Sequence, residues 1–246
     1  MSDVDEAGLS ETVRLCSTTA SRTTFQVLDV ADYNAVTEWA AQVVDDHGQV
    51  NLIFNNAGVA LSATVEGMSY EDLRWLMDIN FWGVVHGTKA FLPHLQAADE
   101  GHVINISSVF GLLSIPSQSA YNASKFAVRG FTDALRIELD AERSSVSATT
   151  IHPGGIKTNI ARRARFDASA TSAQERDAFI AEFDKIARTS PERAAEQILV
   201  AVQRNRRRAL IGPDAVVFDV VSRLPAGLYQ RVLALGARRD RKRRAT

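Results

Sequence analysis

A tyrosine and a lysine four residues apart, Tyr121 and Lys125, are the side chains of this chain best placed to move a proton. Residues four apart share one face of a helix, so the two side chains can converge. A free tyrosine has a pKa of about 10, which makes it a poor acid or base at neutral pH. A nearby lysine cation stabilises the phenolate and lowers that pKa. Taken alone, the pair would favour an ordinary contact on a helix surface.

Ser108 is a third candidate, thirteen residues before Tyr121. It follows the apolar run of residues 103–106, which is typical of a buried strand. Ligands bind beyond the carboxyl ends of the strands in a parallel sheet. We therefore expect the Ser108 hydroxyl to hold a substrate oxygen at that end of the sheet.

The elements that must position these side chains alternate along the whole chain. The predicted strands span residues 24–28, 50–55, 102–107, 146–152 and 209–212, and the predicted helices span residues 5–16, 35–46, 69–95 and 119–141. Apolar strands separated by helices indicate a parallel sheet that is covered on both faces. The sequence therefore predicts a doubly wound, Rossmann-like α/β fold, with a single domain over residues 1–235.

Composition argues against several classes of protein. Hydrophobic residues make up 46% of the chain and charged residues 23%, as in ordinary globular domains. No apolar run reaches the roughly 20 residues of a membrane-spanning helix, and the acidic N-terminus does not resemble a signal peptide. The single Cys16 allows no internal disulfide, and the five histidines show no metal-ligand spacing. We expect a cytoplasmic protein with no metal site, no integral membrane segment and no nucleic-acid partner.

The charge is unevenly placed along the chain. Residues 236–246 carry a net charge of +5, which leaves −6 for the rest. Such a basic tail could tether an acidic partner or an anionic lipid. The preferred interpretation is a frayed, solubilising terminus.

Four motifs occur in an order and spacing that go beyond the tyrosine and lysine pair. They are Ile106-Ser-Ser-Val-Phe-Gly111 followed by Pro116, Tyr121 and Lys125; Asn55-Asn-Ala-Gly58; Asp78-Ile-Asn80 with Gly83, Thr88 and Pro93; and His152-Pro-Gly-Gly-Ile-Lys-Thr158. Together they resemble the short-chain dehydrogenase/reductase family over residues 2–229. The resemblance implies an NAD(P)-dependent oxidoreductase that interconverts a secondary alcohol and a ketone or aldehyde.

The resemblance also implies a role for each candidate residue. Tyr121 would be the general acid/base, Lys125 would lower its pKa and bind the nicotinamide ribose, Ser108 would polarise the substrate oxygen, and Asn80 would anchor a water in the proton relay. The implied cofactor-binding residues are Asp3, Asp29, Val30, Asn55, Asn56, Ala57, Gly58, Tyr121, Lys125, Pro153, Gly154, Ile156 and Thr158. Within this set the Ile156 backbone and the Thr158 hydroxyl would bind the carboxamide, and Asp29 and Val30 would contact adenine.

The resemblance further implies the ligands and the assembly. Asp3 falls where an acid would bind the adenosine ribose 2′-hydroxyl and repel a 2′-phosphate, so NAD is preferred and NADP is less favoured. Residues 159–190 resemble substrate-covering helices, and their apolar residues suggest a lipophilic alcohol or carbonyl substrate. An amphipathic helix packed on the body of the protein is an equal alternative for this segment. Residues 216–235 could cover the active site or touch a membrane, and the cover is preferred. Pairing through helices 69–95 and 119–141 would give a homodimer or homotetramer.

The chain departs from the family at its beginning. The first strand, the glycine-rich Thr-Gly-x-x-x-Gly-x-Gly turn, the first helix and most of the second strand, about 35 residues, have no counterpart. Without that central strand, we expect residues 52–55 to expose a backbone edge. Two explanations are open. The favoured one is that Met1 is a mis-assigned start and that the lacking residues are encoded upstream. The alternative is a catalytically inactive protein that uses the scaffold for binding or oligomerisation.

Overall fold

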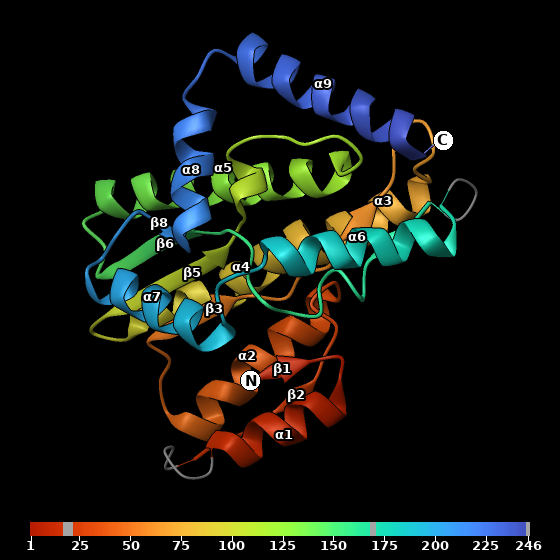
Figure 1. Cartoon of the computed structure of the whole chain (residues 1–246). Helices are drawn as coiled ribbons and strands as arrows, with labels where there is room; N and C mark the ends of the chain where they lie inside the picture. Colours follow the sequence, from red (N-terminus) through yellow and green to blue (C-terminus); the bar gives the residue numbers. More distant parts are fainter. Residues whose placement is uncertain (17–21, 168–170, 245–246) are drawn as a thin grey trace.

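The computed structural model describes residues 1–16, 22–167 and 171–244, with side chains described to residue 238. Its central element is a parallel sheet of four strands in the order β3 (Leu52–Asn55), β5 (Gly101–Ile106), β6 (Val146–Pro153) and β8 (Arg208–Ile211). The predicted doubly wound α/β fold is confirmed (Figure 1). The four strands lie within one or two residues of their predicted ranges because their apolar runs are continuous.

Helices cover both faces of this sheet. The helices are α2 (Tyr33–His47), α4 (Gly83–Ala97), α5 (Ser119–Ala141) and α7 (Pro191–Gln203). Val103 belongs to a buried cluster with residues of α2, α4 and α5, whereas its neighbour Ile104 belongs to a second cluster with residues of α7. Successive side chains of a strand point to opposite faces, so each face of β5 has its own apolar core.

The N-terminal strands form a separate sheet. β1 (Ser2–Asp3) pairs in parallel with β2 (Gln26–Val27), and α1 (Glu6–Cys16) connects to them (Figure 1). Within the described part of the chain, β3 pairs with β5 and its other edge has no strand partner. Leu52 and Phe54 on β3 are 46% and 39% exposed. The open edge expected for residues 52–55 is therefore present in this structure.

The prediction of one continuous α-helix over residues 69–95 is wrong. The structure has α3 (Tyr70–Met77), a π-helical turn at Asp78–Trp82, and then α4. The Gly83 N–H bonds the Asp78 carbonyl five residues back, which is the π pattern. Such single turns carry an extra residue inside a helix and are frequent at functional sites. Here the turn contains Asn80, whose side chain is fully buried.

The remaining elements lie around the sheet. They are β4 (Leu61–Ser62) paired with β7 (Arg165–Phe166), the 3-10 turn Val109–Gly111, α6 (Ala173–Ile186), α8 (Pro213–Ser222) and α9 (Ala226–Arg244). The expected boundary between residues 235 and 236 coincides with no element end, because α9 continues to Arg244. No helix in the described part of the chain is long and apolar enough to cross a membrane.

Candidate active site

The four expected catalytic side chains come from three segments that meet at the carboxyl end of β5. Tyr121 and Lys125 lie in the first turns of α5, Ser108 follows β5, and Asn80 lies in the π turn. All four are buried. Burial raises the pKa of the Tyr121 hydroxyl, the Ser108 side chain acts to lower it, and the Lys125 ammonium lies 5.6 Å from the centre of the tyrosine ring. The structure thus brings together a phenol, an alcohol and a cation that lie up to 17 residues apart in the sequence.

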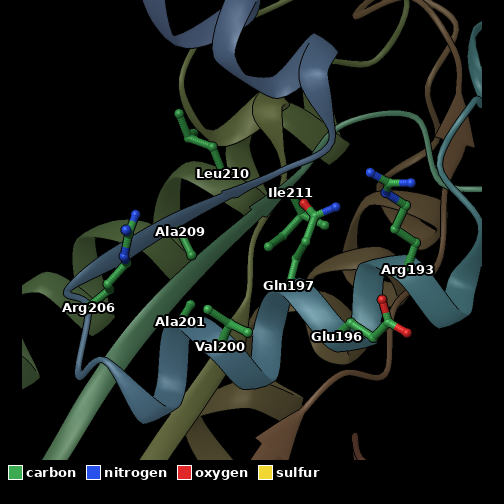
Figure 2. A pocket seen from close by; sticks show the side chains of 9 residues that line it. All are labelled: Arg193, Glu196, Gln197, Val200, Ala201, Arg206, Ala209, Leu210 and Ile211. Atoms are coloured by element: carbon green, nitrogen blue, oxygen red, sulfur yellow. The ribbon is translucent and has the colours of Figure 1, made fainter.

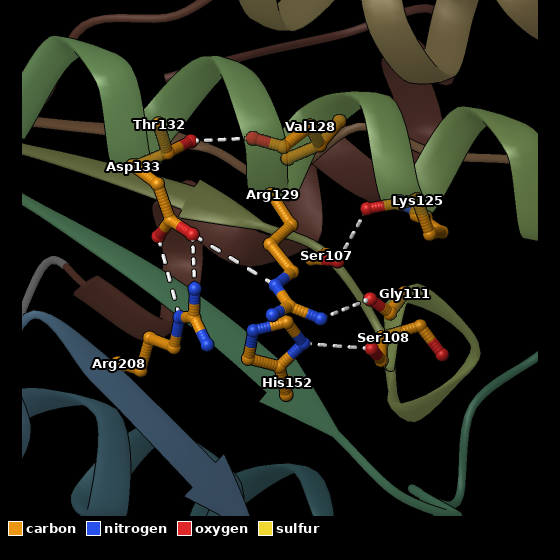
Figure 3. Close-up of polar contacts among 10 residues, drawn as sticks. All are labelled: Ser107, Ser108, Gly111, Lys125, Val128, Arg129, Thr132, Asp133, His152 and Arg208. Carbon is orange, nitrogen blue, oxygen red and sulfur yellow. Dashed lines mark hydrogen bonds and ion pairs between the residues drawn. The ribbon is translucent and has the colours of Figure 1, made fainter. Parts of the chain in front are cut away.

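The backbone around Ser108 is fixed by polar contacts (Figure 3). The Ser108 Oγ accepts a hydrogen bond from the Phe110 N–H at 3.1 Å and caps the 3-10 turn. The Ser108 carbonyl accepts one from Nδ1 of His152 at 2.8 Å. Arg129 donates to the Gly111 carbonyl at 3.3 Å and lies 3.8 Å from the Asp133 carboxylate. These contacts hold the serine hydroxyl in place beside the tyrosine.

Lys125 is buried in a polar cradle made mostly of backbone. Its ammonium donates to the Ile106 carbonyl at 3.0 Å, and its own carbonyl accepts from the Ser107 hydroxyl at 2.8 Å. Gly111 packs against the same turn, because a Cβ there would lie 2.7 Å from the Lys125 carbonyl oxygen. The lysine is therefore held between the end of β5 and the 3-10 turn.

The pKa shifts differ from the expectation. Burial raises the pKa of Tyr121, and the hydrogen bond with Ser108 opposes that shift. Burial lowers the pKa of Lys125 from 10.5 to about 8. The expected lowering of the tyrosine pKa by the lysine is therefore not seen in the protein alone, because desolvation disfavours the charged form of both groups.

The lowered lysine pKa makes stability depend on pH. The folded state releases the Lys125 proton at a pH of about 8 and the unfolded chain at about 10.5, so the unfolded state binds more protons between these values. We expect the free energy of unfolding to rise by roughly 3 kcal/mol from below pH 8 to above pH 10.5. Denaturant titrations across this range measure the rise, and Lys125→Met should remove it. An equal rise in that variant would contradict the assignment.

Asn80 connects the π turn to two other segments. Its amide accepts from the Val59 N–H at 2.8 Å and donates to the Val59 carbonyl at 2.9 Å. It also lies 3.3 Å from the Ser124 hydroxyl, which in turn donates to the Tyr121 carbonyl at 2.8 Å. A Cβ on Gly58 would lie 3.4 Å from Asn80 and 3.5 Å from the Lys125 ammonium. Asn80 therefore positions the segment after β3 beside the lysine.

The expected cofactor residues after β3 divide into two groups. The Asn55 side chain is directed into the fold, where it donates to Thr88 at 3.1 Å and to Asn105 at 2.8 Å. Asn56, Ala57 and Gly58 are exposed beyond the strand end. The structure thus gives Asn55 a positioning contact and leaves the next three residues open to a ligand.

The segment from Pro153 to Thr158 is a turn beyond the carboxyl end of β6. The Asp214 carboxylate accepts from the Gly155 N–H at 2.6 Å, and a Cβ on Gly154 would lie 2.2 Å from that carboxylate. Ile156 forms a β-bridge with Thr189. Sequence reasoning missed Asp214, because it lies 59 residues after Gly155 and has no local motif.

The N-terminal cofactor residues lie in the separate sheet. Asp3 and Asp29 are exposed, and their carboxylates accept from the N–H groups of Asp5 and Ala31. Val30 packs on Gly83, and its carbonyl accepts from the His86 ring at 3.0 Å. These contacts join the end of β2 to α4.

The residues present suit the nicotinamide half of a dinucleotide better than its phosphates. Buried Lys125, Tyr121 and the open Pro153–Thr158 turn offer donors and an open surface. The turn from β1 into α1 instead contains Asp3, Asp5 and Glu6, and Asp5 accepts from the Gly8 N–H at 3.0 Å. This turn is the one expected to hold the adenosine ribose through Asp3, and its helix N-terminus, filled by the Asp5 carboxylate, offers no site to a pyrophosphate.

A groove of about 550 Å³ lies away from these residues, between α7 and β8. Figure 2 shows it lined by Arg193, Glu196, Gln197, Val200, Ala201, Arg206, Ala209, Leu210 and Ile211. None of the expected catalytic or cofactor residues is among them. No cluster of three or more metal-ligating side chains occurs in the part of the chain described.

Comparisons with known proteins identify the family. The profile of the family described as short chain dehydrogenase matches residues 1–169. A putative oxidoreductase, SadH, of Mycobacterium tuberculosis is 45% identical over 237 residues, which cover 96% of this chain and 84% of that protein. Dehydrogenase/reductase SDR family member 7B of Mus musculus is 33% identical and covers 89% of this chain and 65% of that protein.

One solved structure allows a comparison of the fold. It is a short chain dehydrogenase/reductase from Burkholderia phymatum in complex with NAD. It is 28% identical, with a TM-score of 0.81 over 91% of this chain and 82% of that one.

Proposed function

The chain belongs to the short-chain dehydrogenase/reductase family of oxidoreductases, and from that premise we propose that it interconverts a secondary alcohol and a ketone or aldehyde with a nicotinamide cofactor. The observation that carries the proposal is the burial of Tyr121 together with Ser108 and Lys125, with the Lys125 ammonium over the tyrosine ring at 5.6 Å. An ordinary surface pair would be exposed to solvent, whereas these side chains are buried and connected to three segments of the fold.

Each side chain has a task in this reaction. The Tyr121 hydroxyl gives a proton to the carbonyl oxygen in reduction and takes it from the alcohol in oxidation. The Ser108 hydroxyl donates to the same oxygen and fixes its place. Lys125 stabilises the phenolate that forms when the proton leaves. Asn80 positions Val59 and, through Ser124, the Tyr121 backbone. The bound cofactor supplies or accepts the hydride.

The residues that would hold the cofactor are those of the open turns. Lys125 and Tyr121 would bind on the nicotinamide side with Ile156 and Thr158. Residues 56–58 would line the adenosine side of the cofactor. Asp3 supports NAD over NADP, because its carboxylate repels a 2′-phosphate. The NAD complex of the Burkholderia phymatum relative is consistent with this preference.

The surroundings of Tyr121 favour a lipophilic substrate. Tyr121 packs in an apolar cluster with Leu61 and Ile160, and its ring lies edge-on to Phe110 at 6.3 Å. Phe110 contacts Phe218 of α8 at 6.0 Å, so α8 forms part of the cover over this region. An apolar surface beside the reacting oxygen stabilises the carbon skeleton of the substrate.

A cofactor titration tests the proposal. We expect the purified chain to quench NADH fluorescence saturably and to bind NADPH about tenfold more weakly, because of the charge on Asp3. Asp3→Asn should narrow that difference, whereas Asp45→Asn, on α2, should leave it unchanged. Oxidation of a panel of secondary alcohols then measures turnover. If neither NADH nor NADPH binds, the oxidoreductase proposal is overturned.

The second candidate is a scaffold protein that binds or oligomerises without catalysis. It is favoured by the sequence, which contains no glycine-rich Thr-Gly-x-x-x-Gly-x-Gly turn that could hold the cofactor pyrophosphate. Ile137 is 65% exposed on α5, one of the two helices expected at the subunit interface. Light scattering that shows a dimer or tetramer, together with no affinity for NADH, would support this candidate.

A further inference from the structure

The outer side of α9 carries an apolar stripe that no described residue covers. Leu228, Val232 and Leu235 are spaced by four and three residues, so they share one side of the helix. Their exposed fractions are 52%, 62% and 55%. Tyr229 and Leu233 are half-buried on another side. The helix therefore packs on one side and presents a second apolar side to solvent.

The helix before it has the same organisation. On α8, Val216, Val217 and Val220 are exposed, and Leu224 continues their line beyond the helix end. Phe218, on a different side, is the residue that contacts Phe110 next to the active site. Covering the active site therefore uses one side of α8 and leaves the valines free. We call α8 and α9 together, residues 213–244, the C-terminal arm.

Positive charge follows the apolar stripe along the same helix. Residues 236–246 carry +5, while the rest of the chain carries −6. Because α9 extends from Ala226 to Arg244, the stripe and most of this basic run belong to one continuous helix. Arg231 and Arg238 are exposed. Figure 1 shows α9 at the top of the molecule, on the side away from β1 and β2.

We propose that the C-terminal arm binds the surface of a bilayer that contains anionic phospholipids. An amphipathic helix with apolar and basic residues lies in the interface, with its apolar side among the acyl chains and its cations near the headgroups. Parallel pairing of two copies through this helix would bring two basic runs together, and their like charges repel. An interfacial helix also agrees with the finding that no described helix could span a membrane.

Vesicle sedimentation tests the proposal directly and requires no enzyme activity. The purified full chain is mixed with sucrose-loaded vesicles of phosphatidylcholine, with or without about 30 mole per cent of phosphatidylglycerol. We expect the protein to sediment with the anionic vesicles and to remain in solution with the neutral ones. Raising the salt from about 0.05 M to about 0.5 M should weaken the binding, because salt screens the charges.

Matched variants distinguish insertion from charge attraction alone. Leu228→Glu and Val232→Glu should each lower the vesicle partition coefficient by about tenfold, since each removes a buried apolar contact with the bilayer. Leu199→Glu is the control, because Leu199 is similarly exposed on α7, outside the arm, and should change little. Circular dichroism of every variant confirms that the fold is kept.

Three results would overturn the proposal. They are equal sedimentation with both vesicle types, no sedimentation with either, and unchanged binding by the Leu228→Glu and Val232→Glu variants. Concentration-dependent dimerisation that Val232→Glu abolishes, without any vesicle binding, would assign the stripe to a second copy of the chain.

Discussion

Replacing Tyr121 with phenylalanine is expected to lower kcat by about 10²- to 10⁴-fold, the usual contribution of a positioned acid/base group. The change removes one hydroxyl and keeps the ring that packs on Phe110 and in the apolar cluster. The cofactor affinity should therefore change by less than about twofold, because the phenyl ring fills the same space. The substitution should therefore lower turnover while leaving cofactor binding almost unchanged.

Steady-state kinetics and NADH titration on the same preparation measure both quantities. Tyr70→Phe is the matched control, because Tyr70 lies exposed at the start of α3 and loses the same single atom. It should leave kcat unchanged. A Tyr121→Phe variant with the kcat of the unmodified chain would remove the acid/base role and with it the proposed mechanism.

The Asn80→Asp substitution is expected to destabilise the fold more than any single-atom change at the protein surface. It replaces the amide nitrogen that donates to the Val59 carbonyl at 2.9 Å with an oxygen that cannot donate when ionised. The new carboxylate would be fully buried, and among the described residues no cation is hydrogen-bonded to Asn80. A buried carboxylate without a hydrogen-bonded cation costs at most roughly 3 to 5 kcal/mol of unfolding free energy, and attraction to the nearby Lys125 ammonium reduces that cost.

Denaturant unfolding at two pH values checks both the size and the cause. The loss should be smaller at pH 5 than at pH 8, because a protonated aspartic acid can donate to Val59 again. Asn34→Asp on the exposed side of α2 is the control and should change stability by less than about 0.5 kcal/mol. A loss of equal size at both pH values would indicate that shape, rather than charge, is responsible.

Local patterns in the sequence predicted most of the fold. The apolar run before Ser107 corresponds to β5, because a strand that is buried on both faces is continuously apolar. The spacing from Ser119 to Ala141 corresponds to α5, because a helix that is buried on one face has apolar residues at helical spacing. The convergence of Tyr121, Lys125 and Ser108 followed from the same elements. The open edge of β3 was predicted as well, since a parallel sheet of this order needs a strand beside it.

Features that depend on tertiary contacts could not be read from the sequence. The π turn at Asp78–Trp82 has no periodic signature, because its extra residue is accommodated by packing around Asn80. The contact between Asp214 and Gly155 joins segments that have no shared motif. The direction of the Tyr121 pKa shift depends on how deeply the ring is buried, which the four-residue spacing does not reveal.

The division between the two sheets has a consequence for cooperativity. β1 and β2 share no described hydrogen-bonded ladder with β3, so the N-terminal unit is connected to the body through side-chain contacts. These include Val30 on Gly83 and the exposed ion pair between Arg163 and Asp5 at 2.8 Å. Contacts of this kind open at lower free energy than a continuous sheet. Unfolding should therefore proceed in two steps, and Tyr121 belongs to the part that opens last.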